Sequence, residues 1–125
     1  MTYPWTADEL SLFDDAHELE IAVQRTGGSR DAWTPIWVVS AGGQVYVRSW
    51  HRRDTGWFGH AVESLRARVR VPGLESDVLI KDIAGTSQEV TASVDAAYRA
   101  KYGQGGAGSM VTPDAAQTTL KLARV

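Results

Sequence analysis

The side chains best suited to bind a ligand lie close together in the middle of the chain, in a short segment that follows a predicted hairpin. Arginine presents a planar fork of donors to a phosphate or carboxylate, and a serine hydroxyl adds another donor. A helix that begins near Trp57 would add unpaired backbone amides with partial positive charge. The segment therefore predicts an anion site, and the alternative is a solvated loop whose arginines pair with Asp54 or Glu63. Its polar side chains are Arg48, Ser49, His51, Arg52 and Arg53.

Tryptophans flank this segment. Trp33, Trp37, Trp50 and Trp57 stand on either side of it, so a planar ligand would find aromatic walls beside its anion site. Core packing is the alternative for each of them, because tryptophan is large and is often partly buried. Trp50 and Trp57 are the stronger candidates because they stand next to the charges.

Other kinds of chemistry have little support. The chain contains no cysteine, which excludes disulfides, thiolate metal sites and a cysteine nucleophile. His17, His51 and His60 do not have the spacing of a metal motif, so no metal is predicted. There is no G-x-S-x-G elbow, no P-loop and no dinucleotide-binding glycine motif. Catalytic residues therefore stay unidentified.

Hydrophobic periodicity predicts the elements that position these groups. Thr6 and Glu9 form a capping-box pattern ahead of a first helix. Gly42-Gly43 predicts a tight hairpin turn, and Gly103 marks the end of the clearest helix, where a glycine-rich loop follows. Helices are expected at 7–16, 57–67 and 88–102, and strands at 19–23, 36–39, 45–50, from 69, from 78 and at 118–122.

Length and composition indicate a single folded domain, residues 1–125. A hydrophobic fraction of 43% and a charged fraction of 22% are typical of globular proteins, and a net charge of -2 weakly opposes a nucleic-acid partner. The opening MTYPWTADEL lacks the features of a signal peptide, and no apolar run approaches the roughly 20 residues of a membrane helix. A cytoplasmic location without membrane contact is expected.

Several segments carry a resemblance to known proteins. PIWVV, QVYVRSW, DAAYRAKYG and TTLKL together resemble a bacterial family of small proteins of unknown function, nearly along the whole chain. That family is similar to the flavin-binding split barrels, which include pyridoxamine-phosphate oxidases and deazaflavin-dependent nitroreductases. This wider likeness covers mainly Pro35 to Val71. It implies an α+β, mainly β fold, a split β-barrel of about six mostly antiparallel strands with two or three helices.

The resemblance also implies a cofactor and its site. The cofactor would be flavin mononucleotide (FMN) or a deazaflavin, held in a homodimer whose sites lie between the subunits. Arg48, Ser49, Arg52 and Arg53 would contact its phosphate, and Trp57 would cover one face of its ring. Residues beside the ring would be Pro35, Ile36 and Trp37, with Trp50 as a further aromatic wall. The implied function is that of a flavin- or deazaflavin-binding protein, an oxidoreductase acting on a small organic substrate.

Two other functions stay open. The same anion pocket would suit a non-redox protein that binds a phosphorylated or carboxylated small molecule. The arginines and tryptophans would also suit base stacking in a nucleic-acid or protein interaction module. The short basic segment and the mildly acidic chain argue against that last function.

Overall fold

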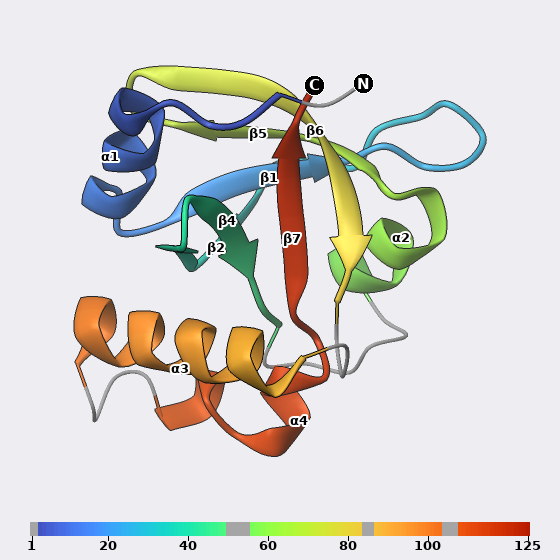
Figure 1. Cartoon of the computed structure of the whole chain (residues 1–125). Coiled ribbons are helices and arrows are strands. Elements are labelled where there is room, and N and C mark those ends of the chain that lie inside the picture. The colour runs from blue at the N-terminus through green and yellow to red at the C-terminus, as the bar shows by residue number, and fades with distance from the viewer. Residues whose placement is uncertain (1–2, 50–55, 84–86, 104–107) are drawn as a thin grey trace.

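The computed structural model describes residues 3–49, 56–83, 87–103 and 108–125, apart from the side chain of Ser109. Helices and strands alternate irregularly along the chain (Figure 1). The helical elements are α1 (Ala7–Asp15), α2 (Gly56–Ser64), α3 (Gln88–Tyr102), the 3-10 turn η1 (Gly108–Met110) and α4 (Pro113–Ala116). The strands are β1 (Leu19–Val23), β2 (Thr34–Ile36), β3 (Val38–Ala41), β4 (Gln44–Val47), β5 (Arg66–Val71), β6 (Leu74–Asp82) and β7 (Leu120–Arg124).

All these strands form one antiparallel sheet in the order β2-β1-β5-β6-β7-β4-β3. The two edge strands, β2 and β3, are neighbours in the sequence and are separated only by Trp37. The sheet therefore curls until its edges meet, which makes a nearly closed barrel with a seam at Trp37. The predicted α+β, mainly β split barrel is confirmed.

The barrel interior is the main hydrophobic core. Strand residues alternate between the interior and the outer face, so Val45 and Val47 of β4 point inward while Tyr46 points outward. Phe13 of α1 and Phe58 of α2 belong to the same core. The two helices lie on opposite sides of the barrel (Figure 1). Other fully buried members include Leu19, Ile21, Val23, Val38, Val69, Leu120 and Leu122.

Helix α3 covers the outer face of β3 and β4 (Figure 1). Val94 and Tyr98 of α3 pack there against Val39 and Tyr46 and form a second, smaller core. The helix is capped by Ser87, whose hydroxyl accepts from the amide of Val90. The prediction of a helix at 88–102 is confirmed residue for residue.

Two local sequence signals are confirmed, the capping box of α1 and the glycine turn between β3 and β4. The capping box forms with both hydrogen bonds, between Thr6 and Glu9, at the start of α1. The hairpin between β3 and β4 turns at Gly42 and Gly43, with φ angles of 58° and 80° that favour glycine.

The prediction for the second helix was wrong at its end. Helix α2 stops at Ser64 because Leu65 adopts a left-handed conformation, with φ of 61°, and its amide donates to the carbonyl of Ala61 at 2.9 Å. Glycine is the usual residue at such a position, so a leucine there carries no signal that the helix ends. Arg66 and Arg68 consequently belong to β5 and not to the helix.

The run at 36–39 is also not one strand. It divides at Trp37 into the end of β2 and the start of β3, which lie at opposite edges of the sheet. The short helix α4 has its own signal, with Thr112 as N-cap and Pro113 in the first turn. None of the helices in the described part of the chain is long and apolar enough to cross a membrane.

Candidate functional site

Arg48 follows β4 directly and is fully buried beneath α3. Its Nη1 donates to Asp95 Oδ1 at 2.5 Å and to the Met110 carbonyl at 2.7 Å. Its Nε donates to Thr119 Oγ1 at 2.9 Å, and its Nη2 lies 3.5 Å from the Thr91 carbonyl. These acceptors come from α3, from η1 and from the residue just before β7. One guanidinium therefore joins three segments that lie far apart in the sequence.

Ser49 is held by the same region. Its backbone amide donates to Thr118 Oγ1 at 2.8 Å, and the Thr118 hydroxyl donates to the Ser49 carbonyl at 2.9 Å. Both residues are buried. The contacts fix the point where the chain leaves β4, so Arg48 and Ser49 position the segment that follows them. Their predicted contact with a cofactor phosphate stays a prediction.

Tyr98 lies against the Arg48 guanidinium, whose Cζ is 5.6 Å from the centre of the tyrosine ring. Its hydroxyl has no hydrogen-bond partner of good geometry among the described residues, although the Arg48 backbone lies close to it. Burial raises the pKa of Tyr98 well above its usual value. The hydroxyl therefore stays protonated at all physiological pH values.

Of the other candidates from the central segment, the structure describes Trp57. Trp50, Arg52 and Arg53 lie outside the described residues. Trp57 is the second residue of α2 and is half-buried, with its ring edge-to-face with Phe58 at 5.6 Å. The predicted role of Trp57 as a cover for a cofactor ring stays a prediction.

The ring-side candidates lie together at the seam of the barrel. Pro35 is exposed, Ile36 is buried and Trp37 is half-buried between the two edge strands. The Trp37 ring stacks on Tyr102 from the end of α3, with ring centres 4.0 Å apart and planes 6° from parallel. His17 meets both rings edge-on, at 6.0 Å and 5.5 Å. We call Trp37, Tyr102 and His17 the seam platform.

Hydrogen bonds hold the seam platform in place. The Tyr102 hydroxyl donates to the His17 carbonyl at 2.6 Å and accepts from the Val38 amide at 3.1 Å. Lys101 Nζ donates to the carbonyls of Val38 and Phe13, at 2.7 Å and 2.9 Å. Burial raises the pKa of Tyr102 to about 12 and lowers the pKa of Lys101. The platform is therefore a fixed aromatic surface, tied to β3 and α1.

A third polar group lies near α2. Asp31 accepts from Arg25 Nε at 2.5 Å and pairs with His60 Nδ1 at 2.7 Å. Burial would raise the pKa of Asp31, but the hydrogen bonds and charges of His60 and Arg25 outweigh it, so the pKa lies below the usual value. An adjacent pocket of about 180 Å³ is lined by Arg25, Thr26, His60 and Glu63.

The lowered pKa of Asp31 predicts a pH dependence. A carboxylate whose pKa is lower in the folded state contributes stability above the unfolded value of 3.8 and loses it as the pH falls through the folded value. The free energy of unfolding of the wild-type protein should therefore fall below about pH 4. In Asp31→Asn it should be about 1 kcal/mol lower at neutral pH and should decrease less steeply as the pH falls. Urea unfolding between pH 2.5 and 7 measures both. Parallel acid limbs in the two proteins would contradict the assignment.

The structure also identifies residues that sequence patterns missed. Asp95 and Thr119 bind the Arg48 guanidinium, and Thr118 holds the backbone of Ser49. Tyr102 belongs to the seam platform, and Lys101 binds backbone carbonyls beside it. Asp95 lies about one turn before Tyr98 on α3. The sequence pattern predicts a solvent-exposed side chain at such a helix position. Adjacent threonines before a strand are a weak signal, because threonine is common in strands. No group of metal-binding side chains occurs among the described residues.

The fold is similar to that of several solved structures. HutZ, the heme storage protein of Vibrio cholerae, is 10% identical with a TM-score of 0.71, over 95% of this chain and 89% of that one. The conserved hypothetical protein Rv2991 of Mycobacterium tuberculosis is 10% identical with a TM-score of 0.67, over 99% and 81%. An F420 reductase is 13% identical with a TM-score of 0.52, over 91% and 90%. At these identities the likeness shows the fold alone.

Sequence comparison identifies the family. No curated protein matches the chain. The family described as "Uncharacterized protein conserved in bacteria (DUF2255)" matches residues 9–122, from within α1 to within β7. The chain therefore belongs to this bacterial family, with the split-barrel fold.

Proposed function

We propose that this protein binds FMN or a deazaflavin against the seam platform and acts as an oxidoreductase on a small organic substrate. The observation that carries the proposal is the parallel stack of Trp37 on Tyr102 at 4.0 Å, beside the exposed Pro35. A flat ring system gains most from a rigid aromatic surface whose own side chains lose little freedom on binding. Pro35, Ile36 and Trp37, three of the predicted ring-side residues, lie at this seam, which supports the proposal.

The similar structures support a cofactor of this class. One is an F420 reductase and another is a heme storage protein, and both share the fold of this chain at high coverage. When bound, a flavin or deazaflavin supplies the hydride or electron transfer. The residues of the chain then bind the cofactor, orient it and exclude water from it.

The residues present fit the ring of such a cofactor better than they fit its phosphate. The seam platform offers aromatic area and a backbone edge. Arg48 is fully engaged with Asp95, Thr119 and the Met110 carbonyl, so it fits a positioning role. Under this proposal Arg52 and Arg53 provide the direct phosphate contacts, from a segment whose start is fixed by Arg48 and Ser49.

A homodimer completes the proposed site. Two pockets that described residues line, of about 180 Å³ and 140 Å³, are smaller than the roughly 300–1,000 Å³ typical of ligand sites. Neither encloses a flavin. A second subunit packed over the seam platform would cover the exposed face of the ring.

Heme is the second candidate for the same surface. His17 is exposed and lies edge-on to both rings of the seam platform, so its imidazole is placed beside any flat group stacked there. Imidazole is a common axial ligand of heme iron. The likeness to HutZ favours this candidate as well.

The test is a spectroscopic titration of the purified protein with FMN, with the deazaflavin F420 and with hemin. We expect one of the first two to bind at micromolar levels, and Trp37→Ala to weaken binding about tenfold, which corresponds to about 1.4 kcal/mol of lost stacking. Trp33→Ala is the matched control. Trp33 is also half-buried but lies over Arg70, away from the platform, so its removal should leave affinity unchanged.

The outcomes separate the candidates. Binding of hemin alone, lost in His17→Ala, would replace the flavin proposal with the heme one. Stabilisation by phosphorylated small molecules without any flavin or heme binding would favour the non-redox alternative, because a ligand that binds only the native state raises its melting temperature. Equal affinities of Trp37→Ala and Trp33→Ala would remove the seam platform from the site.

A further inference from the structure

Arginines of β5 lie on the outer face of the sheet, and two of them, Arg68 and Arg70, are in ion pairs with residues of the neighbouring strands β6 and β1. Arg68 donates to Glu75 at 2.6 Å and to Asp77 at 2.8 Å. Arg70 donates to Glu20 at 3.0 Å. These pairs run across neighbouring strands on one face of the sheet, where opposite charges are expected to stabilise pairing.

Two further arginines on this face have no such partner. The side chains of Arg30 and Arg66 form no hydrogen bond or ion pair within the described parts of the chain, and both are exposed. Both line a single pocket of about 140 Å³. Asp77 has the only acidic side chain among the described residues that line this pocket, and it is already paired with Arg68. The side chains around the pocket therefore carry an excess of positive charge.

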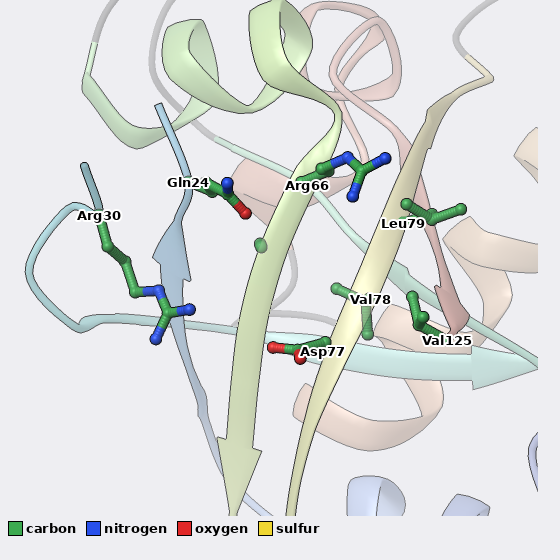
Figure 2. A pocket seen from close by; sticks show the side chains of 8 residues that line it. Gln24, Arg30, Arg66, Asp77, Val78, Leu79 and Val125 are labelled. Carbon is green, nitrogen blue, oxygen red and sulfur yellow. The ribbon is translucent and has the colours of Figure 1, made fainter. Parts of the chain in front are cut away.

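The strand register brings the two arginines to the same side of the sheet. Gln24 bridges to Arg30 in antiparallel fashion, and its amide donates to the Arg66 carbonyl at 3.0 Å. Arg66 in turn pairs with Leu79 of β6. Opposite residues of antiparallel strands present their side chains on one face, about 5 Å apart. Figure 2 shows the resulting row, with Gln24 between Arg30 and Arg66 and with Leu79 beyond them.

Arg30 is placed by an ordered turn. The Arg25 amide donates to the Ser29 carbonyl at 2.7 Å, and the Asp31 amide donates to the Val23 carbonyl at 2.8 Å. Gly28 takes a φ of 93°, which allows the chain to reverse within this turn. The arginine thus returns to the edge of β1 at a fixed position, so the two cations are separated by one neutral amide.

The rest of the pocket is apolar. Val78, Leu79 and Val125 form its other side (Figure 2). Its volume of about 140 Å³ is that of between four and five water molecules at roughly 30 Å³ each, so it admits a small molecule and not a flavin ring. Two guanidinium groups suit a carboxylate, and the apolar side suits a short aliphatic chain.

We propose that this pocket binds a short-chain carboxylic acid in its ionised form, with the carboxylate between Arg30 and Arg66 and the alkyl group against Leu79 and Val125. The Gln24 amide would donate a further hydrogen bond. None of the residues of this pocket belongs to the seam platform. The proposal is therefore independent of the cofactor proposed above.

The test is a titration of the complete chain with butyrate, followed by two-dimensional ¹H–¹⁵N NMR. Shifts are expected at Ala67, Leu79 and Val125. Butyramide has nearly the same shape without the charge, and should bind about tenfold more weakly because the arginines then lose their ionic partner. Arg30→Gln and Arg66→Gln should each weaken butyrate binding by about the same factor.

Lys81→Gln is the matched control, because it removes one positive charge from an exposed position on β6 that does not line the pocket. Its butyrate affinity should equal that of the wild type. Equal shifts with butyrate and butyramide, no shifts at 20 mM butyrate, or an equal loss in Lys81→Gln and Arg66→Gln would each overturn the proposal. Inorganic phosphate that binds as tightly as butyrate would also overturn it, since the apolar side would then contribute nothing.

Discussion

Replacement of Arg48 by methionine is expected to lower the free energy of unfolding by about 3–5 kcal/mol, the range for a buried ion pair that loses one partner. Methionine keeps most of the length and apolar stem of the side chain. It leaves Asp95, the Thr119 hydroxyl and the Met110 carbonyl without their donor. Because these groups come from α3, from the residue before β7 and from η1, their loss weakens the attachment of α3 to the sheet. Urea denaturation followed by circular dichroism measures the change.

Two further variants make this result specific. Arg70→Gln breaks an exposed ion pair with Glu20 and should cost less than about 1 kcal/mol. Asp95→Asn combined with Arg48→Met should be less unstable than Arg48→Met alone, because no unpaired carboxylate remains in the double variant. If Arg48→Met were as stable as Arg70→Gln, the buried network would not hold α3 in place.

Replacement of Phe58 by alanine is the second large effect, with an expected loss of about 3–5 kcal/mol. Phe58 is fully buried in the barrel core and is the main anchor of α2, with Ala61 beside it. Truncation to a methyl group leaves a cavity that the rigid strands around it cannot fill. The helix should then detach more readily from β1 and β6, so amide hydrogen exchange should rise along α2 first.

Leu65→Ala is the control for that variant. Leu65 directly follows the same helix, but its side chain is 43% exposed, so its truncation should change stability by no more than about 0.5 kcal/mol. The left-handed backbone conformation at this position costs alanine and leucine a similar conformational energy. The substitution therefore leaves this contribution to stability unchanged. Equal losses in Phe58→Ala and Leu65→Ala would show that α2 is not held by the barrel core.

The sequence predicted the fold where the signals were local. The capping box at Thr6, the paired glycines at 42 and 43, and the amphipathic pattern of α3 each depend on residues within one or two turns of each other. The resemblance of the segment 35–71 to split barrels supplied the topology, which periodicity alone does not determine.

The missing parts depend on long-range geometry. Trp37 interrupts what reads as a continuous apolar strand, and only the closure of the barrel separates β2 from β3. Leu65 ends a helix without the glycine that normally marks such an end. The sequence predicts that Arg48 binds a ligand, because its partner Asp95 lies 47 positions away and the pairing is not visible in the local pattern. A sequence pattern cannot show whether a cation is neutralised by a residue so distant along the chain.

The position of β7 has a consequence for how the protein is made. It pairs with β6 on one side and with β4 on the other, so among the described strands it is the one whose pairing joins the hairpin β3–β4 to the rest of the sheet. On a ribosome, at about 5–20 residues per second, it is also the last of the described strands to be synthesised. Until it emerges, β4 and β6 each keep an open edge, which is where nascent chains pair wrongly with one another. Chaperone demand during translation should therefore fall sharply once residues 120–124 leave the exit tunnel.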